Sequence, residues 1–223
     1  MTLAKMSSKR KVFLVEDHPI TREGFAQLIN YQDDLAVCGQ AGTVSAAMDG
    51  INETSPDLVV VDVTLPDGHG IELVKILRAQ LPKLRILVLS MHEELLYAER
   101  ALQAGARGYV MKQEPTHVVM TAIRQVLQDE TYLSPKMQRA VVQRFAGKPA
   151  TNGISELEHL TDRELQVFEL LGRGQSTSQI ARRLRISIST VETHRAHLKE
   201  KLQTRTGPEL VYRAVEWVGR NRV

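Results

Sequence analysis

Five short apolar segments, separated by longer segments with helical periodicity, constrain the fold of the first 130 residues. The apolar segments cover residues 11–17, 35–39, 58–63, 85–90 and 108–112, and each predicts a β-strand. The segments between and after them, 19–31, 43–54, 70–81, 94–105 and 116–129, predict amphipathic helices. Three of the strands are continuously apolar, which is typical of parallel strands covered on both faces. The alternation therefore predicts an α/β domain over residues 9–130, with a doubly wound, five-stranded parallel sheet.

The rest of the chain follows a different pattern. Residues 131–155 contain a short basic helical segment, 136–145, followed by AGKPATNGIS, whose Gly, Pro, Asn and Ser residues indicate a linker. Thr161 and Glu164 match a capping box at the start of a helix that ends near Gly172. Further helical segments follow at about 177–184, 189–202 and 207–218. The sequence therefore predicts a second domain at residues 156–223, an all-α four-helix domain.

Composition and charge narrow the functional classes. The single cysteine, Cys38, excludes an internal disulfide and a thiolate metal cluster. No apolar segment approaches the ~20 residues that cross a bilayer, so we expect no membrane association and a cytoplasmic location. Residues 1–129 hold 13 Lys and Arg against 16 Asp and Glu, whereas residues 155–223 hold 12 against 9. This difference favours the C-terminal domain as the part that binds a polyanion.

Acidic side chains end two of the predicted strands. Glu16 and Asp17 end the first strand, and Asp62 lies near the end of the third. The carboxyl ends of parallel strands meet at one edge of a sheet, so we expect these three carboxylates to lie together. A divalent cation relieves their mutual repulsion, and oxygen-only ligands favour Mg²⁺. A carboxylate beside Mg²⁺ is suited to attack phosphorus and form an acyl phosphate.

Two further side chains reach the same edge. Ser90 ends the fourth strand and Lys112 the fifth, and they offer a hydroxyl group and a cation to phosphoryl oxygens. Each of these residue types is common at protein surfaces. The complete set, placed at the ends of different strands, indicates a phosphoryl-transfer site.

Residues 10–130 resemble a receiver domain, and the segment VVVDVTLPDGHG carries much of the resemblance. The resemblance implies a flavodoxin-like fold in which Asp62 is the phosphoacceptor, assisted by Lys112 and Ser90. It implies Mg²⁺ binding by the carboxylates of Glu16, Asp17 and Asp62 and by the backbone carbonyl of Thr64. Phosphorylation would draw Ser90 inward and let Tyr109 rotate, which shifts the population of two conformations. Thr64 and His92 occupy positions that tune autodephosphorylation in this family.

The C-terminal domain contains a short helix, a tight turn and a polar, partly basic helix. The apolar faces of these two helices consist of Ile180, Ala181 and Leu184, and of Val191, Leu198 and Leu202. This arrangement fits a helix-turn-helix whose second helix enters the DNA major groove. The segment LTDRE…GRGQSTSQIARRL…STVETHRAHLKEKL is similar to the helix-turn-helix of NarL/FixJ regulators and of the wider LuxR-type proteins.

This similarity implies that the helix at 189–202 binds double-stranded DNA. The expected contact residues are Glu192, Thr193, Arg195, Ala196, His197, Lys199 and Lys201, with Arg182 and Arg183 from the preceding helix. Glu192 is suited to accept a hydrogen bond from cytosine, Thr193 to touch a thymine methyl group, and the Arg and Lys residues to bind phosphates. In the family the last helix often forms a dimer contact. Here that contact would consist of Leu210, Val211, Ala214 and Val215, although the sequence leaves open that some of them belong to the core of one domain.

The two resemblances together imply a two-component response regulator. A histidine kinase would phosphorylate Asp62, and the protein would bind DNA to regulate transcription, as a homodimer when phosphorylated or DNA-bound. We expect no enzymatic activity beyond self-phosphorylation and self-dephosphorylation. One alternative is a phosphohydrolase with Asp62 as its nucleophile, but such enzymes usually need a second acid or a larger cap. Another is a constitutive DNA-binding protein whose receiver only dimerises, and the complete set of pocket residues argues against it.

Overall fold

The computed structural model describes residues 9–91, 94–145, 157 and 159–220. The chain forms two compact units, Met1–Met137 and Gln138–Val223. The boundary falls within helix α6 (Pro135–Phe145), which the sequence predicts at 136–145. Residues 146–155, the second part of the predicted linker, lie outside the described residues.

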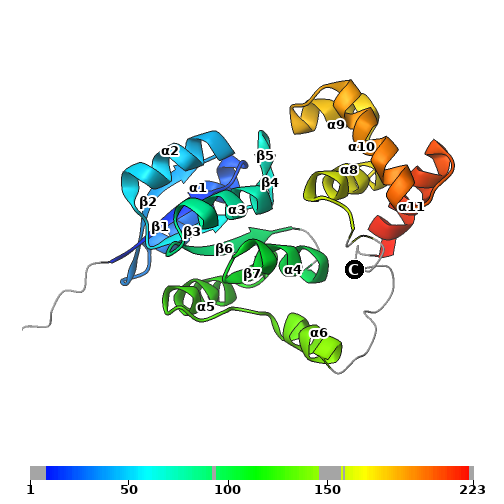
Figure 1. Cartoon of the computed structure of the whole chain (residues 1–223). Helices are drawn as coiled ribbons and strands as arrows, with labels where there is room; N and C mark the ends of the chain where they lie inside the picture. Colours follow the sequence, from blue (N-terminus) through cyan, green and yellow to red (C-terminus); the bar gives the residue numbers. More distant parts are fainter. Residues whose placement is uncertain (1–8, 92–93, 146–156, 158, 221–223) are drawn as a thin grey trace, which may run out of the picture. The chain divides into compact units, whose positions relative to one another are not determined.

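A five-stranded sheet forms the centre of the first unit (Figure 1). Its strands are β1 (Arg10–Val15), β2 (Leu35–Ala41), β3 (Leu58–Val61), β6 (Arg85–Ser90) and β7 (Gly108–Met111). Their order is β2-β1-β3-β6-β7, and every neighbouring pair is parallel. The connecting helices are α1 (Pro19–Asn30), α2 (Val44–Thr54), α3 (Gly70–Gln80), α4 (Glu94–Ala104) and α5 (Thr116–Leu127). The predicted doubly wound α/β fold is confirmed.

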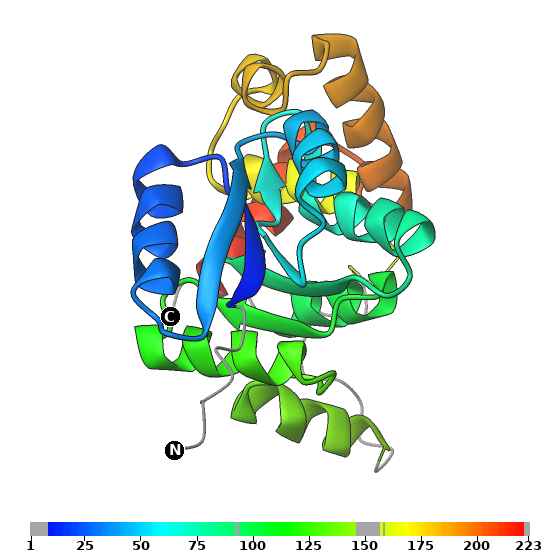
Figure 2. The same cartoon turned by 90° about the vertical axis from the view of Figure 1, so that its left-hand side faces the viewer.

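Both faces of this sheet are covered by helices, as the continuously apolar strands predict. Helices α1 and α5 lie on one face, and α2 and α3 lie on the other (Figure 2). Alternate strand residues point to opposite faces, so Val12 and Val60 pack in a cluster with residues of α1 and α5. Phe13 points to the other face, where its ring lies against Gly50 of α2. Burial on both faces fixes the register of the strands and therefore the positions of their carboxyl ends.

Two short features lie outside the predicted pattern. The loop after β3 forms a hairpin of β4 (Thr64–Leu65) and β5 (Gly68–His69). After α5 the chain returns to the sheet, where the Tyr132 N–H donates to the Arg107 carbonyl at 2.9 Å and Tyr132 forms a parallel bridge with Gly108. Residues that the sequence assigns to the linker are therefore attached to β7.

Helices make up the second unit where it is described: α8 (Asp162–Gly172), α9 (Thr177–Leu184), α10 (Ile188–Lys201) and α11 (Gly207–Arg220). The capping box of Thr161 and Glu164 is present at the start of α8. Helix α8 lies so close to α11 at Gly172 that a Cβ atom there would be 2.3 Å from the Ala214 carbonyl oxygen. Within the described ranges, no helix has the length and apolar character needed to cross a membrane.

Candidate functional site

The predicted pocket residues lie together at the carboxyl edge of the sheet. The Asp62 N–H donates to the Val15 carbonyl at 2.8 Å, which places Asp62 beside the end of β1. The Lys112 N–H donates to the Ser90 carbonyl at 2.8 Å, which aligns the ends of β6 and β7 in the same way. Glu16, Asp62 and Ser90 are all buried. The parallel register thus brings residues at the carboxyl ends of four strands into one site, called the acidic pocket below.

Lys112 is the buried cation of the acidic pocket. Its Nζ lies 2.5 Å from Glu16 Oε2 and 2.8 Å from Asp62 Oδ2, and the three side chains are only 8%, 6% and 5% exposed. Burial disfavours the charged ammonium group, but the carboxylates of Asp62 and Glu16 outweigh this effect and raise the pKa of Lys112. The pocket therefore holds a fixed positive charge beside Asp62.

Asp17 and His18 extend the pocket toward solvent. Single ligand atoms of Glu16, Asp17 and His18 all lie within 4.8 Å of one another, and His18 Nδ1 is 2.7 Å from Asp17 Oδ1. The sequence predicts the two carboxylates as ligands, but not the neighbouring imidazole. Carboxylate oxygens so close together suit a hard divalent cation such as Mg²⁺.

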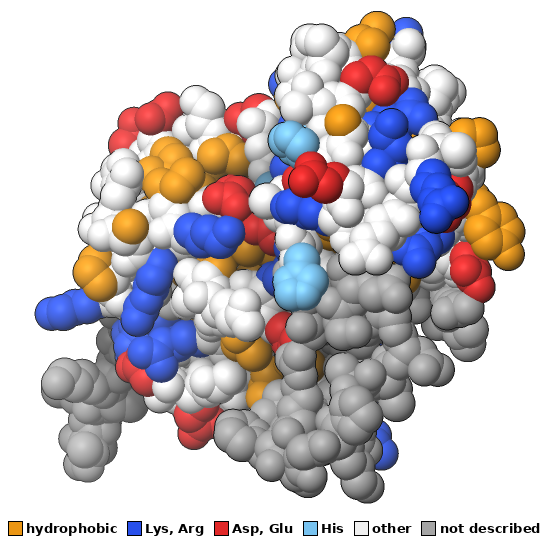
Figure 3. All heavy atoms as spheres, turned by 45° about the vertical axis from the view of Figure 1, so that its right-hand side comes forward, with side chains coloured by type: hydrophobic (Ala, Val, Ile, Leu, Met, Phe, Trp, Pro, Cys, Tyr) orange, Lys and Arg blue, Asp and Glu red, His pale blue; other side chains and the backbone are white. Residues whose placement is uncertain are grey.

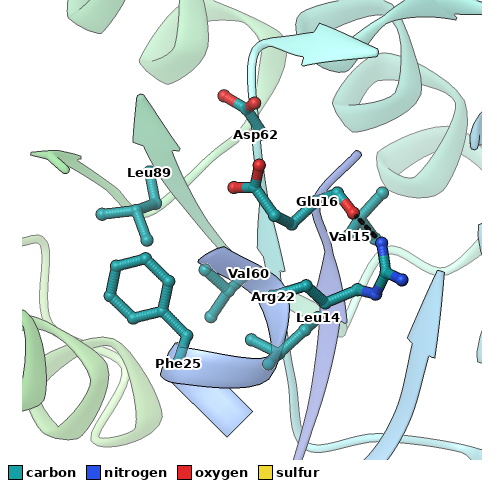
Figure 4. Close-up of a pocket in the computed structure, with 8 residues that line it drawn as sticks. All are labelled: Leu14, Val15, Glu16, Arg22, Phe25, Val60, Asp62 and Leu89. Atoms are coloured by element: carbon teal, nitrogen blue, oxygen red, sulfur yellow. Dashed lines mark hydrogen bonds between the residues drawn. The ribbon is translucent and has the colours of Figure 1, made fainter. Parts of the chain in front are cut away.

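Arg22 is a pocket residue that sequence reasoning missed. Its Nη1 donates to the Glu16 backbone carbonyl at 2.7 Å. In Figure 4 the carboxylates of Glu16 and Asp62 lie close together, with Phe25 and Leu89 on one side and Arg22 on the other. Arg22 thus fixes the backbone that carries the acidic pair. The only local signal is its place near the start of the helix that follows this pair.

The loop after Asp62 is held at both ends. The Asp67 carboxylate accepts hydrogen bonds from the N–H groups of Val44 and Ser45, at 2.7 and 3.1 Å, and so anchors the loop to the start of α2. A Cβ atom at Gly70 would lie 2.0 Å from the Asp62 carbonyl oxygen, so only glycine fits there. These contacts hold the hairpin that begins at Thr64.

The predicted switch residues are both in the interior. Ser90 is fully buried, and Tyr109 on β7 is 1% exposed. Tyr109 is therefore already inward in this structure, and its rotation stays a prediction. His92 lies outside the described residues.

Helix α10 has the two faces that the sequence predicts. Val191 and Leu198 are buried, whereas Glu192, Thr193, Ala196 and His197 are exposed. Exposed side chains of α9 include Arg182 and Arg183. The exposed charged residues of α10 are Glu192, Glu200 and Lys201, so this helix is mixed in charge. Figure 3 shows basic and acidic side chains close together on one face of the molecule.

Two of the α10 side chains that the sequence predicts as DNA contacts lie near Glu164 of α8. Lys201 Nζ lies 2.7 Å from Glu164 Oε2, and His197 Nδ1 lies 3.5 Å from Glu164 Oε1. Glu164 is almost fully buried, which raises its pKa, but hydrogen bonds from Lys201 and Thr161 outweigh burial and lower it overall. The Lys201 ammonium group therefore serves the packing of α8 against α10.

The residues expected at a dimer contact divide into two groups. Leu210 and Ala214 are completely buried, so they belong to the core. Val211 is half-buried and Val215 is 49% exposed, and the neighbouring Tyr212 is 69% exposed. An α11 contact would therefore use Val211, Tyr212 and Val215, and Tyr212 was not predicted.

Known protein families match both domains of the chain. A family described as "Response regulator receiver domain" matches residues 12–132, and one described as "Bacterial regulatory proteins, luxR family" matches residues 158–214. The oxygen regulatory proteins NreC of Staphylococcus carnosus and Staphylococcus epidermidis are 31% and 32% identical to this chain. Each match covers 92% of this chain and 97% of the relative.

Solved structures of response regulators are also similar to this chain. A LuxR-family two-component response regulator from Aurantimonas sp. SI85-9A1 is 35% identical, with a TM-score of 0.59 over 62% of this chain and 99% of that chain. RcsB from Salmonella enterica serovar Typhimurium, solved bound to promoter rprA, is 23% identical and similar in fold, with a TM-score of 0.64 over 92% of this chain and 98% of that chain. Receiver domains bind Mg²⁺ at an acidic pocket, and this chain has such a cluster. The chain belongs to the two-component response regulators with a receiver domain followed by a LuxR-family DNA-binding domain.

Proposed function

We propose that Asp62 accepts a phosphoryl group from a histidine kinase. The pairing of Lys112 with both Asp62 and Glu16 is the observation that carries this proposal. As the bond between an Asp62 oxygen and phosphorus forms, the bond between phosphorus and the donor atom breaks. Lys112 and the Ser90 hydroxyl group then contact the phosphoryl oxygens, where charge accumulates.

We propose that Mg²⁺ is the metal of the acidic pocket. The ligands would be the carboxylates of Glu16, Asp17 and Asp62 and the backbone carbonyl of Thr64. All of these donors are oxygens, as Mg²⁺ prefers. When bound, the ion neutralises charge on the phosphoryl group. Arg22 orients the backbone that carries the acidic pair, and Asp67 orients the loop that carries Thr64.

For the second domain we propose that α10 enters the major groove of double-stranded DNA. Thr193 and Ala196 would face the bases, and Lys199, Arg182 and Arg183 would contact phosphates. RcsB has been solved as dimers bound to DNA. A homodimer of this chain, formed on phosphorylation or on DNA, would use the exposed residues of α11.

We further propose that the protein works in the cytoplasm, where bacterial DNA is found. Its own chemistry would be limited to gaining and losing the phosphoryl group of Asp62. A phosphohydrolase, the alternative, would turn over small phosphomonoesters continuously.

Intact mass after incubation with acetyl phosphate and Mg²⁺ tests the acceptor. We expect the wild type and Asp49→Asn, a control at an exposed acid of α2, to gain one phosphoryl group, and Asp62→Asn to gain none. A labelled Asp62→Asn protein would show that the assignment is wrong. An unlabelled wild type, under conditions where another receiver is labelled, would favour phosphate-independent DNA binding.

A further inference from the structure

Three side chains connect the two helices of the helix-turn-helix. The Thr177 hydroxyl group donates to Glu192 Oε1 at 2.9 Å. Arg195 Nη1 donates to Thr177 Oγ1 at 2.6 Å and to Glu192 Oε1 at 3.0 Å. Thr177 is the first residue of α9, and the other two residues lie one turn apart on α10. We call this set the Thr177–Glu192–Arg195 network.

The network includes Glu192, the side chain that the sequence predicts to contact a base. Oε1 of Glu192 already accepts two hydrogen bonds, and one of them comes from a guanidinium group. To accept from a cytosine amino group with this oxygen, Glu192 would have to give up a charge-assisted bond. Exposed ion pairs add little to stability, and Glu192 is 54% exposed. The main effect of the network is therefore to fix the positions of its side chains and not to stabilise the fold.

That geometry concerns Arg195. Its side chain is only 23% exposed, and its Nη2 would lie 3.5 Å from a Cβ atom at Gly207, the first residue of α11. A guanidinium group is a planar fork of five donors, and the network uses donors on only one nitrogen. In a helix-turn-helix the first helix crosses the DNA backbone while the second lies in the groove. A guanidinium group held at the first residue of α9 is therefore placed beside the backbone.

We propose that Glu192, together with Thr177, positions Arg195 for contact with a DNA phosphate, and that Glu192 does not read a base. This inference rests on the DNA-binding function proposed above. Fixing a long side chain before binding lowers the entropy that binding costs. The contribution of Glu192 is then the same for every DNA sequence.

Two substitutions of Glu192 separate positioning from charge. Glu192→Gln and Glu192→Ala both remove the negative charge, but only Gln keeps a carbonyl oxygen to accept from Thr177 and Arg195. Thr177→Ser and Thr177→Val form a second matched pair, since only Ser keeps the hydroxyl group. Each full-length variant is phosphorylated with acetyl phosphate. Its base preference is measured by selection from a randomised duplex library, and its affinity for one fixed duplex is measured at several salt concentrations. Circular dichroism checks that all variants are folded.

We expect Glu192→Ala to bind roughly three- to tenfold more weakly than Glu192→Gln, with the same ranking of bases. Thr177→Val should weaken binding relative to Thr177→Ser in the same way. In an Arg195→Ala background the difference between Gln and Ala at position 192 should disappear. Arg195→Ala itself should make the negative slope of log affinity against log salt shallower by about 0.9.

Two results would overturn the proposal. One is a change of preferred base in both Glu192 variants that persists without Arg195, because Glu192 would then read a base. The other is equal affinity of Glu192→Gln and Glu192→Ala in the presence of Arg195. A wild type that binds no duplex at all would instead refute the DNA-binding function, and this proposal would fall with it.

Discussion

The acidic pocket and the outer face of α10 were both predicted from sequence, but their residues are held in different ways. In the pocket, Glu16, Asp62 and Lys112 directly follow three different strands, and Lys112 Nζ lies within 2.8 Å of both carboxylates. On α10, the expected residues share one helix, yet Lys201 pairs with α8 and Arg195 pairs with α9. Backbone topology fixes the pocket, whereas the positions of Lys201 and Arg195 depend on side-chain contacts with other helices.

Lys112→Met tests the pocket with the largest expected effect. Met has a similar length without the charge, so Glu16 and Asp62 would stay buried without a cation. We expect the receiver domain to lose about 3–5 kcal/mol of unfolding free energy without Mg²⁺, and Mg²⁺ to restore part of it. Chemical denaturation with and without Mg²⁺ measures this. Lys75→Met is the control, because its ion pair with Glu72 is exposed and should contribute little. Equal loss in the two variants would show that the pocket does not depend on its cation.

A substitution of Glu164 tests how much the contact between α8 and α10 stabilises the second domain, for comparison with Lys112 in the receiver domain. Its pKa in the folded state lies below the ordinary value of 4.5, so the unfolded state binds more protons in acid. The stabilisation is therefore present above pH 4.5 and is lost as pH falls through the folded-state pKa. Glu164→Gln should reduce stability at neutral pH by on the order of 1 kcal/mol and flatten this acid dependence. Thermal unfolding of the wild type and of Glu164→Gln is measured from neutral pH to below pH 4.5, with the fluorescence of Trp217 on α11 as the probe. Parallel pH profiles would contradict the role of Glu164.

Substitutions of Lys199 and Lys201 have the smallest expected effects. The comparison is specific, because the two residues lie two positions apart on α10. Lys201 is paired with Glu164, whereas Lys199 forms no ion pair with any other residue that the structure describes. We expect Lys199→Ala to lower the salt dependence of DNA binding by about 0.9 in slope and to leave stability unchanged. Lys201→Ala should lower stability and change the slope less. The reverse pattern would mean that Lys201 leaves Glu164 when DNA binds.

The difference between the two regions also explains which features of the site could be predicted from the sequence. Apolar segments locate the strands, and parallel topology then places Asp62, Ser90 and Lys112 at one edge before any side-chain contact is known. The sequence does not reveal the roles of Arg22 and Asp67, because each side chain binds a backbone group of another element and local periodicity does not show such contacts. The same limit applies to the second domain. Helical periodicity separates Leu198 from Glu192, but it does not show that Thr177 binds Glu192 across the turn.

In the function proposed above, phosphorylation of Asp62 controls the DNA contact made by α10. The direct measurement is the affinity for one selected duplex before and after treatment with acetyl phosphate and Mg²⁺, in the wild type and in Asp62→Asn, with intact mass measured on the same samples. We predict that phosphorylation increases wild-type affinity by about fivefold or more, and that the affinity of Asp62→Asn does not change. Equal affinity of phosphorylated and unphosphorylated wild type would contradict the claim, because the two domains would then act independently.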